Sequence, residues 1–92
     1  MVMNMYSKSS DTSQTRALLL ERLNFRYPNN TTEVEEDNTI IVRLPSATVD
    51  TEFVISLYED YGIVECNGLD NESMGLVREL QVEVDDIYLH YV

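Results

Sequence analysis

The fold is decided by the stretch from Glu52 to Asn67, which reads EFVISLYEDYGIVECN. Apolar and polar residues alternate in its first half, which places Phe53, Ile55 and Leu57 on one side of an extended chain. The polar residues 59–62 then separate this half from a second apolar run. Two alternating runs joined by a short polar turn predict a β-hairpin over residues 52–67.

Upstream of this hairpin, the period of the apolar residues is that of a helix. From Ser13 to about Phe25, side chains such as Leu19, Leu20 and Leu23 return to one face of a helix. Pro28 ends the pattern. We therefore expect an amphipathic helix with its apolar face on the sheet.

The remaining upstream segments differ in their patterning. Residues 1–12 show no period that would bury a face, and they predict a flexible N-terminal tail. The stretch from Thr31 to Asn38 is polar and acidic, and no element is assigned to it. Thr39–Leu44 is rich in β-branched residues and is followed by Pro45, which predicts a strand.

Downstream of the hairpin, the pattern is ambiguous before it becomes regular. Residues 69–80 fit either a short helix capped by Asp70 or Asn71 or a loop that leads into a strand; Gly75 weakens the helix by about 1 kcal/mol relative to alanine. From Arg78 to Asp85 the residues alternate, and Ile87–Tyr91 alternates again. The alternation predicts two further strands, the second closing the sheet.

Together these elements predict an α+β fold in which an N-terminal helix packs on an antiparallel sheet of four to five strands. Residues 13–92 would form a single small acidic domain behind the tail, because 92 residues supply one small core at most.

Charge is the unusual property of the composition. Seventeen carboxylates stand against six Lys and Arg residues, for a net charge of −11. Residues 1–30 carry a balance of +2 and residues 31–92 a balance of −13. Such a chain repels phosphate, so direct nucleic-acid binding is excluded as the expected function. Arg16, Arg22 and Arg26 form the polar side of the predicted helix or pair with an acidic body in the same or a second chain.

Catalytic and metal-binding patterns are weak. Cys66 and His90 are the only residues of their kind, so no intrachain disulfide can form, and a Cys–His pair is disfavoured because Cys66 fits a core position and His90 lies near the C-terminus. The carboxylate clusters match no calcium-loop template. We expect no enzyme activity, no metal and no cofactor. With no apolar run long enough to span a bilayer, we expect a cytoplasmic protein that does not contact membranes.

The predicted contact surface is built from carboxylates and from tyrosines, which are effective interface anchors. Its residues are Glu52, Glu59, Asp60, Glu79, Glu83, Asp85, Asp86, Tyr58, Tyr61 and Tyr88. Core or structural use of the tyrosines is the competing interpretation.

Two functions fit this surface equally. In the first, the chain is an inhibitor whose carboxylates mimic nucleic-acid phosphates and block a basic nucleic-acid-binding protein or nuclease, as small acidic proteins of viruses and mobile elements do. Its 13 excess charges match roughly 22 Å of duplex at one charge per 1.7 Å. In the second, it is an acidic assembly subunit that binds through tyrosines and a sheet edge.

Two further alternatives are adaptation to high salt and an enzyme, both with less support. A terminal strand at residues 87–92 would leave an exposed edge, which favours a homodimer.

Overall fold

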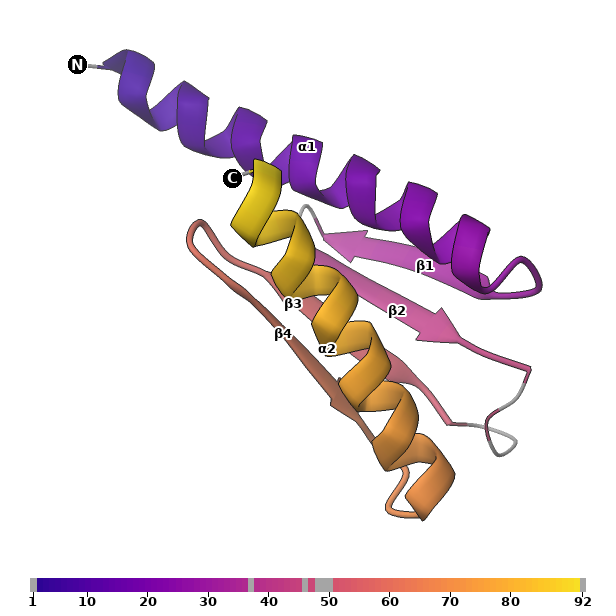
Figure 1. Ribbon diagram of the computed structural model, residues 1–92. Coiled ribbons are helices and arrows are strands. Elements are labelled where there is room, and N and C mark those ends of the chain that lie inside the picture. Colours follow the sequence, from indigo (N-terminus) through magenta and orange to yellow (C-terminus); the bar gives the residue numbers. More distant parts are fainter. Residues whose placement is uncertain (1, 37, 46, 48–50, 92) are drawn as a thin grey trace.

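The computed structural model describes residues 2–36, 38–45, 47 and 51–91, with the backbone alone at residues 2–12, 36 and 91. Its elements follow the chain in the order α1 (Val2–Arg26), β1 (Thr31–Glu36), β2 (Thr39–Arg43), β3 (Phe53–Leu57), β4 (Gly62–Cys66) and α2 (Asn71–Tyr91). The strands form one antiparallel sheet in the order β1-β2-β3-β4, and both helices lie on the same face of it (Figure 1). The expected α+β fold, with an N-terminal helix on an antiparallel sheet of four strands, is confirmed.

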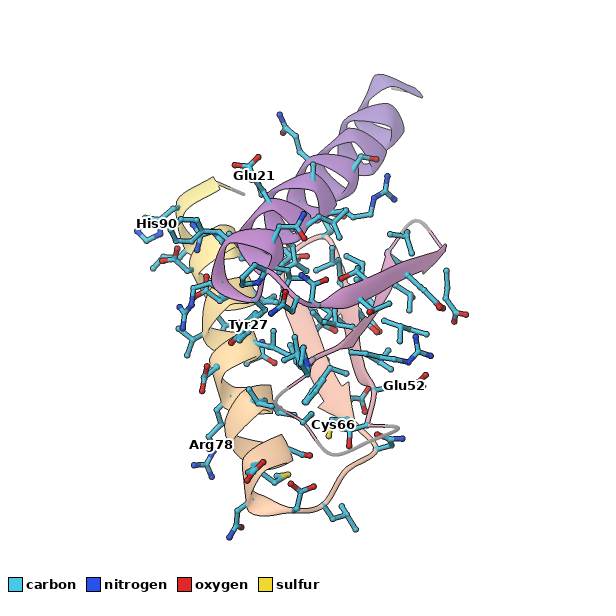
Figure 2. The ribbon with its side chains drawn as sticks, turned by 90° about the vertical axis from the view of Figure 1, so that its right-hand side faces the viewer. Glu21, Tyr27, Glu52, Cys66, Arg78 and His90 are labelled. Carbon is cyan, nitrogen blue, oxygen red and sulfur yellow. The ribbon has the colours of Figure 1, made fainter. Side chains whose placement is uncertain are left out.

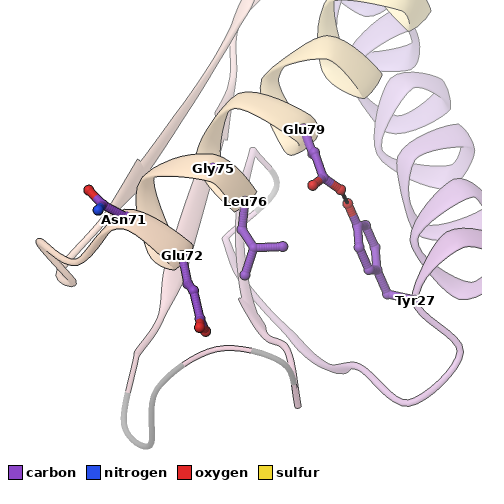
Figure 3. Close-up of a pocket in the computed structure, with 6 residues that line it drawn as sticks. All are labelled: Tyr27, Asn71, Glu72, Gly75, Leu76 and Glu79. Carbon is purple, nitrogen blue, oxygen red and sulfur yellow. Dashed lines mark hydrogen bonds between the residues drawn. The ribbon is translucent and has the colours of Figure 1, made fainter.

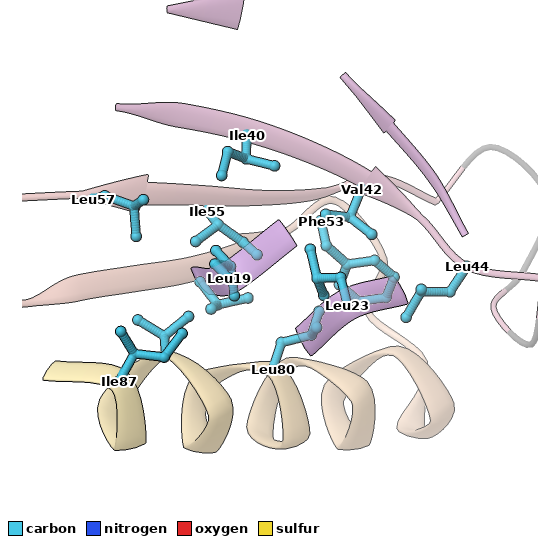
Figure 4. Close-up of a cluster of buried hydrophobic side chains, with 12 residues drawn as sticks. Leu19, Leu23, Ile40, Val42, Leu44, Phe53, Ile55, Leu57, Leu80 and Ile87 are labelled. Carbon is cyan, nitrogen blue, oxygen red and sulfur yellow. The ribbon is translucent and has the colours of Figure 1, made fainter. Parts of the chain in front are cut away.

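The hydrophobic core lies between the sheet and the two helices (Figure 4). β3 contributes Phe53, Ile55 and Leu57, each almost fully buried, as the alternation of the hairpin predicts. The other buried apolar side chains of the core are Leu19, Leu23, Ile40, Val42, Leu44, Val64, Leu80, Val84 and Ile87. Burial of this apolar surface is the main contribution to the free energy that holds the sheet and the two helices together.

On the opposite face of the sheet, no helix of the described residues is packed (Figure 1), and we call this surface the open face. It presents the alternate residues of the strands, among them Ile41, Val54, Ile63 and Glu65, which pair across the ladder or lie diagonally to one another. These side chains are partly or largely exposed. A two-layer arrangement of this kind is typical of antiparallel sheets that cover one face and leave the other in water.

The predicted strands of the central region are confirmed. The strand predicted at residues 39–44 is β2, and the hairpin predicted at residues 52–67 is β3 and β4, which pair from Phe53↔Cys66 to Leu57↔Gly62. Period-two patterning and turn residues were sufficient here because each strand buries one full side.

Two upstream boundaries were wrong. α1 begins at Val2, although the helix was expected to begin at Ser13, and β1 occupies residues 31–36, to which no element was assigned. β1 carries only one large apolar residue, Val34, which is 47% exposed. An edge strand that buries so few apolar side chains has no alternating hydrophobic pattern in its sequence, so the strand could not be predicted from such a pattern. The flexibility of residues 1–12 stays a prediction.

The two strands predicted at residues 78–85 and 87–91 are wrong, because α2 includes both stretches. The buried side chains are Leu80, Val84 and Ile87, whose spacings of four and three residues are helical. Val82, which the alternation placed beside Leu80, is 64% exposed. Residues 87–91 are helical, so they do not form the exposed strand edge on which the expected homodimer was based. Val92 lies outside the described residues.

Asp70 caps α2, as one of the two open interpretations of residues 69–80 required. Its carboxylate accepts hydrogen bonds from the backbone N–H of Ser73 at 3.1 Å and from the Ser73 hydroxyl at 2.8 Å. These bonds, that of the hydroxyl first, lower the pKa of Asp70. A capped start and a buried face outweigh the helix-weakening effect of Gly75.

Gln81 of α2 lies against the outer edge of β4. Its side-chain amide accepts a hydrogen bond from the N–H of Val64 at 3.0 Å and donates one to the carbonyl oxygen of Gly62 at 2.9 Å. These are two backbone groups that a neighbouring strand would bond. Gln81 therefore occupies part of one sheet edge, and β1 forms the other.

The described part of the chain contains no helix with the length and apolar character that a membrane crossing requires.

Candidate functional site

Six of the predicted contact residues gather where the β3–β4 turn meets the C-terminal half of α2. We call this surface the turn patch, and it consists of Tyr58, Glu59, Asp60, Tyr61, Asp85 and Tyr88. The turn itself is closed by a hydrogen bond from the N–H of Tyr58 to the carbonyl oxygen of Tyr61, at 2.8 Å. Glu59 and Asp60, at its tip, are exposed.

Two tyrosine rings are displayed on this turn. The centroids of the Tyr58 and Tyr61 rings lie 4.9 Å apart in a stacked arrangement, and the two residues are 43% and 52% exposed. Stacking fixes the rings relative to each other, which lowers the conformational entropy that a binding partner would have to remove.

Tyr88 connects the turn to α2. Its hydroxyl donates a hydrogen bond to the carbonyl oxygen of Tyr58. Partial burial raises the pKa of Tyr88 to about 12, and the negative charge of Asp60 acts in the same direction. Tyr88 is therefore a neutral donor at physiological pH, and the turn rests on a helix.

Asp85 lies on the side of α2 that faces β4. The side-chain amide of Gln81 donates to an Asp85 carboxylate oxygen at 2.9 Å and also bonds Gly62, the residue next to the turn. The carboxylate of Asp85 is exposed. Glu59, Asp60 and Asp85 thus surround the tyrosines with negative charge.

Glu79, Glu83 and Asp86 belong to a different surface, the contact between α1 and α2. Arg22 bonds Asp86 and, at 3.3 Å, Glu83. Arg26 bonds Glu83 and lies 3.9 Å from Glu79. The Glu83 side chain is only 12% exposed, so a partner has little access to it. We call these five side chains the interhelical ion-pair cluster.

The sequence left open whether these arginines only form the polar side of the helix or pair with an acidic body. In the structure, Arg22 and Arg26 pair with acids of the same chain. The hydrogen bond with Arg22 lowers the pKa of Asp86, and the same bond raises the pKa of Arg22. Tyr27 extends the cluster, since its hydroxyl bonds Glu79 at 3.0 Å and burial raises its pKa to about 12.

Glu52 is the remaining predicted contact residue, and it lies at the other end of the β3–β4 hairpin from the turn. Arg43 bonds its carboxylate and, at 3.3 Å, that of Glu33 on β1. These bonds raise the pKa of Arg43, the one to Glu33 contributing most. Glu52 is therefore part of a cross-strand ion pair rather than of the turn patch.

The structure does not bring Cys66 and His90 together (Figure 2). Cys66 ends β4, just before α2 begins, whereas His90 lies in the last turn of α2, a helix of 21 residues that spans roughly 30 Å. The thiol of Cys66 bonds the backbone of Gly68. His90 lies 3.0 Å from the carboxylate of Asp86. Among the described side chains, no three acidic, His or Cys residues are arranged to hold a metal ion.

No known family model, curated protein or solved structure matches the chain.

Several residues that shape the site were not among those predicted from the sequence. Gln81 positions Asp85, and Tyr27 bonds Glu79. The contact between Gln81 and Asp85 is made within α2 by residues four positions apart, whereas that between Tyr27 and Glu79 connects segments that are distant in the sequence. Both depend on α2 being a helix. Had residues 71–91 been predicted as one helix, the spacing of Gln81, Asp85 and Tyr88 would have placed all three on one face.

Proposed function

We propose that the chain is a non-enzymatic, acidic protein-binding module that recognises a basic protein surface through the turn patch. The observation that carries this proposal is the pair of stacked, exposed tyrosines Tyr58 and Tyr61, bordered by carboxylates and supported from α2 by Tyr88. Tyrosine is enriched at protein interfaces because its large ring is costly to leave in water yet cheap to order.

Charge determines the kind of partner. A net charge of −11 on 92 residues attracts basic surfaces over distances of about the Debye length, roughly 10 Å at 0.1 M salt. The complex would form quickly and would weaken as salt is added. The partner we propose is a basic nucleic-acid-binding protein or nuclease.

Mimicry of nucleic-acid phosphates is the more specific form of this proposal. It is supported by the total charge, and within the turn patch by Glu59, Asp60 and Asp85. The acids Glu83 and Asp86 contribute less to such a surface, because Arg22 and Arg26 bond them directly. Glu79 lies 3.9 Å from Arg26, and half of its side chain stays exposed. Mimicry therefore depends on the turn patch rather than on a continuous row along α2.

The alternative is an assembly subunit that binds through tyrosines and a sheet edge. The available edge is that of β1, since Gln81 occupies part of the β4 edge. β1 carries Glu33 and Glu35, both exposed, so an added strand would also have to be basic.

The test uses the full chain immobilised at low salt, with bound proteins from a cell extract eluted by a salt gradient and then purified. The purified partner is titrated with the wild-type chain, with a Tyr58→Ala/Tyr61→Ala variant and with a Glu59→Gln/Asp60→Asn variant. The charge control is Glu35→Gln/Glu65→Gln, which removes the same two charges from exposed strand positions.

We expect both turn-patch variants to weaken binding about tenfold or more, whereas the charge control weakens it far less. Equal effects of the two charge variants would contradict a role for the turn patch. Mimicry further predicts that duplex DNA competes for the partner and that affinity falls steeply between about 50 and 200 mM salt. If duplex DNA does not compete for the partner, the result would contradict mimicry and support the assembly function.

A further inference from the structure

A groove of about 500 Å³ lies beside the N-terminal half of α2, on the side that faces Tyr27 (Figure 3). Its lining residues are Tyr27, Asn71, Glu72, Gly75, Leu76 and Glu79. Leu76 and the Tyr27 ring give the groove apolar surface, and Glu72 and Glu79 give it negative charge. Tyr27 is held in place by its hydrogen bond to Glu79, at 3.0 Å.

Gly75 is the informative residue of this groove. Glycine inside a helix is unfavourable by about 1 kcal/mol relative to alanine, so its presence needs a reason. A Cβ atom at Gly62 would lie 2.5 Å from Cγ1 of Val84, and one at Gly68 would lie 2.6 Å from Oγ of Ser73, so internal packing explains both. A Cβ atom at Gly75 would have nothing within 4 Å. Packing within the described chain therefore does not require glycine there.

At Gly75 no side chain projects into the groove. A carboxylate lies on either side of this position along the helix. Glu72 and Glu79 are seven residues apart, which is two helical turns and roughly 10.5 Å. In a polyproline II segment, which has three residues per turn, side chains three positions apart lie on the same side and are separated by about 9 Å. The spacing of the two carboxylates thus suits two cations at positions i and i+3 of a polyproline II segment.

We propose that this groove binds a basic segment of a partner protein in the polyproline II conformation. Its backbone passes over Gly75, its apolar side chains contact Leu76 and the Tyr27 ring, and its lysines or arginines pair with Glu72 and Glu79. A second copy of the chain is a poor occupant, because its net charge is −11 and its residues Arg22, Arg26 and Arg43 are engaged in ion pairs. The proposal goes beyond the turn patch, which lies at the other end of α2 and shares no residue with the groove.

The test uses the full chain and a short synthetic peptide with two lysines three positions apart, separated by two prolines, which favour the polyproline II conformation. Binding is measured by fluorescence anisotropy at low salt, and backbone amide NMR locates the contact. The variants are Gly75→Ala and Glu72→Gln, and the matched control is Glu65→Gln, which removes one exposed carboxylate from the open face. A peptide with glutamine in place of both lysines controls for charge.

We expect saturable binding, with amide shifts at Gly75 and Leu76. Gly75→Ala should weaken binding about fivefold or more while its melting temperature stays equal or rises, since alanine favours the helix. Glu72→Gln should weaken binding more than Glu65→Gln does.

Three results would overturn the proposal: no saturable binding, equal affinity of Gly75→Ala and wild type, or equal effects of the two Glu→Gln changes. The test uses neither the turn patch nor its partner, so its failure is distinct from a failure of the proposed function.

Discussion

Tyr88 supports the turn patch from α2. Its hydroxyl bonds the carbonyl oxygen of Tyr58, while the ring remains packed against the core. We expect Tyr88→Phe to lower the free energy of unfolding by about 1 kcal/mol, the net contribution of one such hydrogen bond. Urea denaturation measures this change. Partner affinity is then compared between Tyr88→Phe and Tyr58→Phe. A larger loss of affinity in Tyr88→Phe would show that the positioning of the turn matters for binding, and equal losses would show that it does not.

Gly62 is a position where packing allows no side chain. Because an added Cβ would lie 2.5 Å from Cγ1 of Val84 and 3.2 Å from Leu57 and Tyr88, we expect Gly62→Ala to destabilise the fold by about 1–3 kcal/mol. Thermal unfolding followed by circular dichroism measures this loss. The same change at Gly75 serves as the control, because nothing lies within 4 Å there. Equal melting temperatures for the two variants would contradict the close packing of α2 on β4.

Tyr27 and Tyr88 make stability depend on alkaline pH. Both have their pKa raised from 10.0 to about 12, chiefly by burial. The folded chain therefore holds these protons more tightly than the unfolded chain does. The free energy of unfolding should keep its full value below pH 10 and decrease as the pH rises toward 12. Urea denaturation across this range measures it, and a Tyr27→Phe/Tyr88→Phe variant should lose less. An unchanged loss in that variant would contradict the assignment.

At the scale of elements, the helical nature of residues 71–91 can be tested by two substitutions. In a strand, Leu80 and Val82 would share the buried side, whereas in α2 Leu80 is fully buried and Val82 is 64% exposed. We expect Leu80→Ala to cost about 2–5 kcal/mol and Val82→Ala less than about 0.5 kcal/mol. Chemical denaturation gives both values. Similar costs would favour a strand.

Gln81 closes part of the β4 edge, and its removal should expose that edge. Gln81→Ala leaves the N–H of Val64 and the carbonyl oxygen of Gly62 without this partner. We expect a loss of about 1 kcal/mol and concentration-dependent association through the freed strand. Analytical ultracentrifugation detects the association. Gln14→Ala, an exposed position on α1, is the matched control. If Gln81→Ala has the same oligomeric state as this control, Gln81 does not protect the edge.

Local patterning predicted the elements whose burial is regular and missed those whose burial is not. Phe53, Ile55 and Leu57 are all buried on one side, so the alternation identified β3 and its partner. α2 was missed because the alternation of Leu80, Val82 and Val84 fits a strand locally, although the longer spacing to Ile87 fits a helix. A window of 11–18 residues, including the Asp70 cap, would have favoured the helix.

The candidate site was only partly predictable, for a physical reason. Tyr58, Glu59, Asp60 and Tyr61 are neighbours in the sequence, so a turn brings them together whatever the fold. The separation of Asp85 from Glu83 and Asp86 depends instead on helical geometry, which turns Asp85 toward β4 and the other two toward α1. Composition alone does not distinguish Asp85 from Glu83 and Asp86.

At the scale of the whole molecule, a net charge of −11 should make stability depend on salt. Self-repulsion weakens the compact state, and added salt screens it. We expect the melting temperature to rise as sodium chloride is increased from about 0.02 to 0.5 M, the range over which the Debye length falls from roughly 20 to 4 Å. Differential scanning calorimetry measures the rise. A decrease would show that the ion pairs of Arg22, Arg26 and Arg43 outweigh the repulsion.

The open face of the sheet has a practical consequence. Its side chains, among them Thr39, Ile41, Val54 and Ile63, alternate with the residues that form the core, and none of these four belongs to the hydrophobic core cluster. Selection can therefore rewrite this surface while the interior stays unchanged. In protein engineering, a new binding surface could be introduced on the open face by substitution, while the core and the helices on the other face of the sheet are kept.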